Sequence, residues 1–380
     1  MKTFGDQFTS RREQQVPRTV YLHVGTGKSG TTYLQRVMAR NRGLLKKHGV
    51  IYPGRRSSHF LASMDLRGSG FKGYDYPATE GAWDALVREV QSFSGNAVVS
   101  HETFGRTPPK LVKKAVESFA DRDVKVLITC RDIGRQIPAS WQERVKNRND
   151  QTYVDFLSEV FDGWNDGKTT LRSVFWRTQN LVDLSKRWSG VVGAENVRLV
   201  TVPAPGAATD ELWKRYAAAA DLPDLDYDLD IGTSNASLGT AETELLRRLN
   251  PRYPEGLAWP QYEARIKSRL SRQLALHNIG GKLAVPEKYQ PRTEELAAYM
   301  IDFLRDSGCA VVGDLEELRP SFRSDASLPE DITEEALMEL SLQVLAEVSS
   351  RGQAAKREIS GGEAARVLAN KARARLRLGR

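Results

Sequence analysis

Short apolar runs alternate with amphipathic stretches along the first 200 residues or so of the chain. Runs rich in β-branched residues predict buried strands over 19–24, 97–100, 124–129 and 197–202. Helical spacing lies between these runs, over 31–48, 83–93 and 109–120. Such alternation is typical of a parallel sheet wound with helices. We therefore predict an α/β fold of three layers, in which a central parallel sheet is flanked by helices.

The other segments have different compositions. Residues 1–18 are polar and are expected to form a flexible N-terminal arm, and 53–77 is rich in Gly, Ser and aromatic residues, which predicts a long loop. Residues 235–350 have a mainly helical pattern. We predict one domain over 19–350 with a helical C-terminal part. The tail 351–380 follows it, and its last 27 positions hold eight Lys or Arg against two Glu. A solvated basic end and a weak contact with an anionic surface both fit this tail.

Charge and cysteine usage narrow the class of protein. The net charge of +8 suits a polyanionic nucleotide ligand, but it fits nucleic acid or an anionic membrane equally well. Neither of the two cysteines, Cys130 and Cys309, belongs to a CxxC pair, and the histidines lack metal-ligand spacing. No apolar signal-peptide core or membrane-length run occurs. We expect a cytoplasmic protein without disulfide or metal.

A phosphate-binding loop follows the first predicted strand. The segment GTGKSGTT begins at Gly25, and its glycines allow backbone N–H groups to turn toward an anion. The helix beginning near Thr31 directs its positive end to the same place. Charge and hydroxyl donors come from Lys28, Ser29, Thr31 and Thr32. The candidate binding residues are Gly27, Lys28, Ser29, Gly30, Thr31 and Thr32.

This loop differs from the ATP and GTP loop GxxxxGK[ST]. Its first glycine would have to stand at position 22, which is Leu22, inside the strand. The segment instead resembles the 5'-phosphosulfate loop of the sulfotransferase family, PKSGTT followed by an aromatic residue and Leu. This chain has Gly27 where that family commonly has Pro. The resemblance implies a P-loop-like fold and the donor 3'-phosphoadenosine-5'-phosphosulfate (PAPS), and it places Tyr33 against adenine.

A second part of the resemblance follows the strand 124–129. In the family, an Arg at a strand end and a Ser in the next helix bind the 3'-phosphate of the donor. Arg131 takes the Arg position, and its guanidinium fork suits a terminal phosphate. The family spacing falls on Ala139, so Ser140 is the candidate if Pro138 shifts the helix phase. Segments further on resemble bacterial, particularly actinobacterial, sulfotransferase-like proteins.

Catalysis of sulfuryl transfer requires a base near the acceptor and positive charge near the leaving phosphate. Lys28 suits the second role, and no metal is required if Lys28, Arg131 and backbone donors supply that charge. His101 and Glu102 follow the strand 97–100, and either resembles the base of one branch of the family. Glu102 is slightly favoured as the base, although the unperturbed pKa of a histidine is better suited to a general base at neutral pH.

The sequence thus predicts a PAPS-dependent sulfotransferase that acts on a hydroxyl or amine of a small molecule, sugar or lipid. Aromatic residues at 60, 71, 74 and 76 and the region 164–176 are expected to line the acceptor pocket. A nucleotide-dependent kinase would need a Walker glycine and an acidic magnesium ligand, and the strand before Cys130 offers only Arg131 and Asp132. A non-catalytic nucleotide or polyanion-binding protein is the other alternative. No nucleic-acid partner is expected, and the motifs leave the acceptor and oligomeric state open.

Overall fold

The computed structural model describes residues 18–350 except 56, 166, 167, 170–172, 233–236, 278, 280, 324 and 325. The predicted arm, apart from Arg18, and the basic tail 351–380 lie outside the described residues. None of the helices in the described part is long and apolar enough to cross a membrane.

The chain divides into two compact units, each assembled from separate stretches of sequence. The first consists of Met1–Gln136, Glu159–Gly232 and Pro291–Ser321, and the second of Ile137–Ser158, Thr233–Gln290 and Phe322–Arg380. Helix α6 (Ile133–Lys146) begins in the first unit and continues into the second, and α7 (Tyr153–Asp162) returns to the first.

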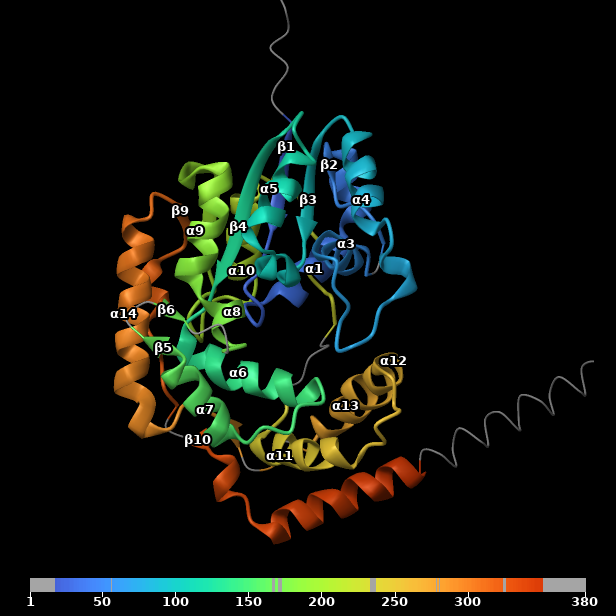
Figure 1. The fold of residues 1–380 in the computed structure, drawn as a ribbon, viewed down its shortest axis with the longest axis vertical. Coiled ribbons are helices and arrows are strands. Elements are labelled where there is room, and N and C mark those ends of the chain that lie inside the picture. The colour runs from blue at the N-terminus through green and yellow to red at the C-terminus, as the bar shows by residue number, and fades with distance from the viewer. Residues whose placement is uncertain are drawn as a thin grey trace, which may run out of the picture. The chain divides into compact units, whose positions relative to one another are not determined.

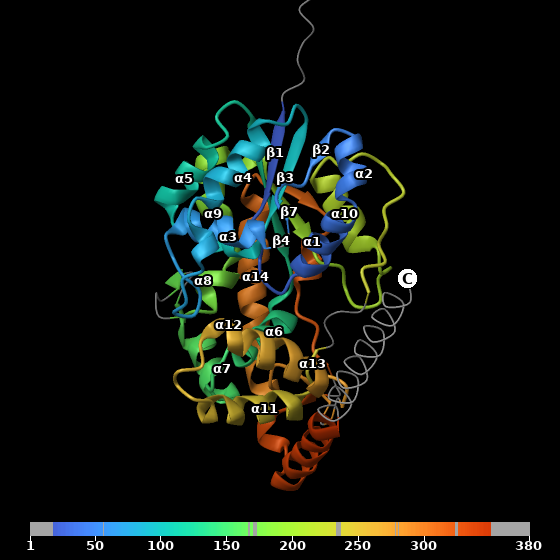
Figure 2. The same ribbon diagram turned by 90° about the vertical axis from the view of Figure 1, so that its right-hand side faces the viewer.

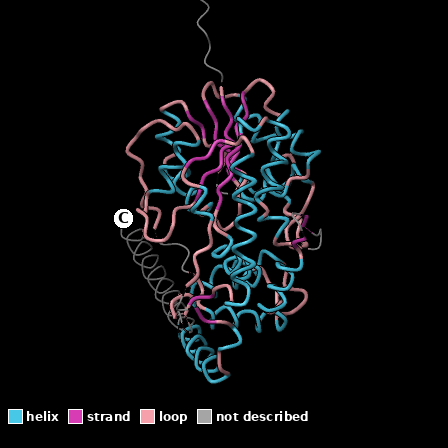
Figure 3. The backbone as a smooth tube through the Cα atoms, turned by 90° about the vertical axis from the view of Figure 1, so that its left-hand side faces the viewer, coloured by secondary structure: helices cyan, strands magenta, loops and turns pink. Residues whose placement is uncertain are grey.

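The first unit is built on a six-stranded sheet in which every pair of neighbours is parallel, in the order β2-β3-β1-β4-β7-β9 (Figures 1 and 3). The strands are β1 (Thr19–His23), β2 (Val50–Ile51), β3 (Asn96–Ser100), β4 (Asp123–Cys130), β7 (Val197–Thr201) and β9 (Ala310–Val312). The residues of β1 are buried on both faces, which explains its unbroken apolar run. The predicted α/β class with a central parallel sheet is confirmed.

Helices cover both faces of this sheet (Figure 2). One side carries α1 (Thr31–Arg40), α2 (Arg42–Lys47) and α10 (Glu211–Ala219), and the other carries α3 (Ser58–Arg67), α4 (Ala82–Gln91), α5 (Pro109–Glu117) and α9 (Leu181–Val192). A core cluster joins Leu34, Val37 and Met38 of α1 to Trp213 and Tyr216 of α10. The predicted apolar face of the first helix is thereby confirmed.

The remaining elements are divided between the two units. In the first unit they are η2 (Glu102–Arg106), β5 (Trp164–Asn165), β6 (Lys168–Thr169), α8 (Trp176–Gln179) and α14 (Gln290–Asp306). The second unit is mainly helical, as predicted for this part of the chain. It contains α11 (Thr240–Leu249), α12 (Trp259–Tyr262), a π-helix (Glu263–Leu270), α13 (Ser271–Leu274), the strand pair β8 (Lys282–Leu283) and β10 (Ala326–Ser327), and a helix over 334–350.

Two predictions of secondary structure are wrong. The helix predicted to run to Gly49 breaks at Asn41, whose side-chain amide donates to Val37 O and Asp228 O and whose oxygen accepts the N–H of Asp228. The predicted loop 53–77 contains α3. That helix buries His59, Ser63 and Leu66 on several sides, so its sequence lacks the single apolar stripe that marks a surface helix.

Candidate active site

The carboxyl ends of three adjacent strands bring the predicted site residues together. β1 lies between β3 and β4, with His23 opposite both Ser100 and Leu127. The N–H of His101 donates to His23 O over 3.1 Å, and the N–H of Thr26 donates to Thr129 O over 2.9 Å. The loop after β1 therefore begins beside the His101–Glu102 segment on one side and the end of β4 on the other, where open α/β sheets bind ligands.

The loop between β1 and α1 has the conformation that its glycines and lysine require. Gly30 has φ of 84°, a conformation that favours glycine, and a Cβ there would lie 2.5 Å from Cδ2 of Leu212, which would have to move. Lys28 has φ of 66°, in the left-handed region that non-glycine residues seldom adopt. A Cβ at Gly25 would lie 3.3 Å from Cα of Glu102, and one at Gly27 would lie 3.8 Å from its Cγ. Loop and Glu102 are therefore close neighbours.

The Ser29 hydroxyl is used inside the protein. It is buried and bonds Thr26 O and the hydroxyl of Thr129 at the end of β4. In this arrangement Ser29 has its backbone N–H, but not its hydroxyl, to offer an anion. Thr31 is buried, Thr32 is exposed and Tyr33 is half-buried against the core near Leu212. The nucleotide contacts predicted for these residues stay predictions.

Two glutamines that the sequence analysis missed support the loop from the far side. Gln136 Nε2 donates to Gly27 O and, over 2.6 Å, to Oε1 of Gln179. Gln179 Nε2 donates to the same Gly27 O over 3.3 Å. No local signal in the sequence marks either residue, because they lie 109 and 152 positions from Gly27.

Arg131 lies directly under the loop. One of its terminal nitrogens donates to Lys28 O over 2.7 Å, whereas its buried Nε has no partner among the described residues. Asp132 does not neutralise it, because both oxygens of that carboxylate accept from Arg135. Burial, together with repulsion by Arg135, lowers the pKa of Arg131 to about 10, against the attraction of Asp132. A buried guanidinium with an unsatisfied donor is suited to bind a phosphate.

Ser140 lies in the part of α6 that belongs to the second unit. Its hydroxyl is buried and has no hydrogen-bond partner in the described part of the chain, so that it has a donor to offer. The helix runs through Pro138 as regular α-helix. The role of Ser140 toward the 3'-phosphate stays a prediction.

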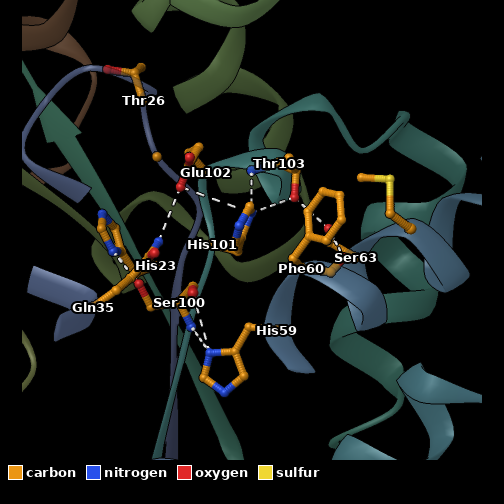
Figure 4. Close-up of polar contacts among 12 residues, drawn as sticks. His23, Thr26, Gln35, His59, Phe60, Ser63, Ser100, His101, Glu102 and Thr103 are labelled. Carbon is orange, nitrogen blue, oxygen red and sulfur yellow. Dashed lines mark hydrogen bonds and ion pairs between the residues drawn. The ribbon is translucent and has the colours of Figure 1, made fainter. Parts of the chain in front are cut away.

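Glu102 and His101 are adjacent in sequence, but their side chains contact different partners (Figure 4). Oε2 of Glu102 accepts from Nε2 of Gln35 over 3.1 Å and lies 3.9 Å from Nδ1 of His101. About a third of the Glu102 side chain is exposed (32%), so that it is open to a ligand. Burial opposes its ionisation, but His101 and the Gln35 hydrogen bond outweigh that effect and hold the pKa of Glu102 below its ordinary value. Glu102 is therefore a carboxylate at neutral pH.

His101 is held as a helix cap. Its Nδ1 accepts the N–H of Thr103 over 3.2 Å and lies 2.7 Å from the Thr103 hydroxyl. Because Nδ1 is an acceptor, the neutral ring carries its proton on Nε2, which cannot take up another. Burial also lowers the pKa of His101; the attraction of Glu102 opposes this shift, and repulsion from Arg67 adds to it. This geometry favours Glu102 over His101 as a base.

The predicted pocket aromatics separate into two groups. Phe60 lies 5.3 Å from the ring of His101 and also contacts the rings of Phe71 and Tyr76. By contrast, Trp164 and Trp176 are 6% and 1% exposed and pack on each other, so neither presents its ring to an acceptor.

A buried polar network connects these strand ends. His23 bonds Ser100 Oγ over 2.7 Å through Nδ1 and Thr129 Oγ1 over 3.2 Å through Nε2. His59 accepts the Ser100 N–H over 3.1 Å through Nδ1, and its Nε2 lies 2.8 Å from Pro53 O. Thr129 in turn contacts Ser29 in the loop. The network supports both the loop and the segment that carries Glu102.

The two buried histidines predict a stability that falls with acid. Burial lowers the pKa of each from 6.5 to about 4. Between those values the unfolded chain binds protons that the folded state refuses, so that each histidine should cost roughly 3 kcal/mol of unfolding free energy by pH 4. Urea unfolding at pH 7, 5.5 and 4.5 measures this slope. His59→Gln should flatten it, whereas the exposed His48→Gln should not, and equal slopes in all three proteins would contradict the assignment.

Comparison with known proteins gives one distant likeness. No protein-family model matches the sequence, and no curated protein matches it significantly. Among solved structures, the chain resembles the crystal structure of a sulfotransferase from Alicyclobacillus acidocaldarius, with a TM-score of 0.38 and 18% identity over 68% of this chain and 99% of that chain.

Proposed function

We propose that this protein is an enzyme that transfers the sulfuryl group of PAPS to a hydroxyl or amine. The observation that carries this proposal is the convergence of Lys28, Arg131 and Glu102 at the ends of three neighbouring strands. Lys28 and Arg131 place two positive charges at the loop of N–H donors, and the Glu102 carboxylate lies beside the same loop. The resemblance of GTGKSGTT to the phosphosulfate loop supports PAPS as the donor.

Each group has one role in the proposed reaction. Glu102 takes the proton of the acceptor as its oxygen or nitrogen forms a bond to sulfur. The bond between sulfur and the bridging oxygen of the 5'-phosphate breaks, and its electron pair leaves with 3'-phosphoadenosine 5'-phosphate. Lys28 and the loop N–H groups neutralise the charge that develops on that phosphate. Arg131 binds the 3'-phosphate and thereby selects this donor against ordinary adenylates.

Donor selection can be tested by binding alone. We expect 3'-phosphoadenosine 5'-phosphate to bind far more tightly than AMP, ATP or GTP in calorimetric titrations, because only the first offers a 3'-phosphate to Arg131. Arg131→Ala should cost about 2–3 kcal/mol of that binding, the range for a lost hydrogen bond to a charged group. AMP binding should change little in the same variant. Equal affinity of the wild-type protein for AMP would defeat this assignment, and preference for ATP with magnesium would favour a kinase.

A further inference from the structure

Three arginines lie on elements that pack together beside the His101–Glu102 segment. Arg67 ends α3, Arg106 ends η2 and Arg177 lies in α8, and both α3 and α8 pack against η2. All three belong to the first unit. Arg67 acts electrostatically on His101, Arg106 on Arg67, and Arg177 on Arg106, so that the three charges form a chain that begins beside the proposed base.

Among the residues that the structure describes, no carboxylate pairs with this group. The guanidinium groups of Arg106 and Arg177 make no hydrogen bond or ion pair there. Within the same described part, Arg67 bonds to its own helix, to Ser63 O over 3.1 Å and to Sδ of Met64 over 3.3 Å. Burial, reinforced by repulsion from Arg106, lowers the pKa of Arg67 to about 10, and Arg177 acts on Arg106 in the same direction. Arg67 is half-buried and Arg106 and Arg177 are exposed, so that the group presents positive charge to the solvent and attracts anions.

The face of α3 that carries Arg67 is the one that contacts the candidate base segment. Phe60, Ser63 and Arg67 recur at helical spacing, and the Ser63 hydroxyl bonds that of Thr103. Phe60 and Ser63 point toward His101 and Thr103 (Figure 4). The charge of Arg67 reaches His101, whose pKa it lowers. An apolar ring wall and a positive cluster thus adjoin the same segment, whereas the loop contacts Glu102 from the side of Gly25 and Gly27.

From this arrangement we infer that the acceptor carries a negative charge of its own, as a carboxylate, sulfate or phosphate on a molecule with a ring that packs on Phe60. The inference rests on the proposed function. The arginines bind the anionic group and hold the acceptor hydroxyl at Glu102. They also offset the repulsion between an anionic acceptor and the anionic donor, which both occupy the site during transfer.

A matched pair of naphthols tests the inference. 2-Naphthol and 6-hydroxynaphthalene-2-sulfonate carry the same acceptor hydroxyl and ring system, and only the second carries an anion. Their binding is followed by naphthol fluorescence in the presence of 3'-phosphoadenosine 5'-phosphate. We expect the sulfonate to bind the wild-type protein at least about 10-fold more tightly, the scale of one hydrogen bond to a charged group. A sulfonate that binds no better than 2-naphthol, or not at all at about 10 mM, overturns the inference.

Variants locate the effect. Arg106→Gln removes an exposed side chain with no bonds to lose, and it should weaken sulfonate binding about 10-fold while 2-naphthol binding stays within about 2-fold. Arg67→Gln should act in the same direction. Arg88→Gln, which removes an exposed charge from α4, is the control and should change neither. Equal losses in Arg88→Gln and Arg106→Gln would show attraction by general surface charge and contradict the site. A nucleotide titration of the same samples distinguishes failure of the proposed function from failure of this inference. If the wild-type protein does not bind 3'-phosphoadenosine 5'-phosphate, the proposed donor is wrong, whereas the effect of the arginine variants on sulfonate binding can still be read.

Discussion

Removal of the Lys28 side chain should lower turnover about 100- to 1,000-fold, the largest effect that we expect from a single change in the loop. This decrease in turnover is the size expected when one preorganised charge that stabilises the leaving phosphate in the transition state is removed. Donor binding should weaken by less, because the backbone donors and Arg131 remain. Single-turnover transfer and nucleotide titration separate the two quantities.

The choice of substitution matters, because Lys28 has φ of 66°. Alanine keeps the Cβ of lysine and therefore the same backbone cost at this φ, whereas glycine would also relax the loop. Lys28→Ala is therefore the cleaner variant, because it removes the charge without a change in backbone preference. If Lys28→Ala weakens binding of 3'-phosphoadenosine 5'-phosphate but keeps full turnover at saturating donor, Lys28 is an anchor and has no part in the chemistry.

Glu102→Gln should lower turnover at least about 100-fold and leave nucleotide binding nearly unchanged. The amide has the shape of the carboxylate, and its oxygen can still accept from Gln35, but it cannot take a proton at neutral pH. His101→Asn is the matched control, because the asparagine oxygen can accept the Thr103 N–H in place of Nδ1. We expect that variant to retain activity within about 10-fold.

The pH dependence of the wild-type enzyme provides a second measurement of the base. Because the pKa of Glu102 is lowered, the carboxylate persists above pH 4.5, and the acidic limb of kcat/KM should lie below that value. Removal of the Gln35 donor, as in Gln35→Leu, should move the limb to higher pH, because the hydrogen bond favours the charged form. If His101→Asn abolishes transfer while Glu102→Gln is active, the roles of the two residues are reversed.

Several features of this protein follow from local sequence. The strands β1, β3, β4 and β7 are mostly apolar, and a parallel sheet buried on both faces requires such strands. The glycine loop after β1 is equally local, because its conformation depends on glycines, Lys28 and the start of α1 within a few positions. Elements of two or three residues, such as β2 and β9, cannot be predicted from periodicity, because too few side chains alternate to make a pattern.

Tertiary structure decided which atoms of the predicted residues can act. The Ser29 hydroxyl turns inward because Thr129, a hundred positions later, lies beside it. Gln136 and Gln179 support the loop only because α6 and α8 bring them to Gly27. Arg67, Arg106 and Arg177 are unremarkable in the sequence, and they form one positive group because α3 and α8 both pack on η2. Hydrogen bonds and charge repulsion depend on distance in space, which a single sequence specifies only through the completed fold.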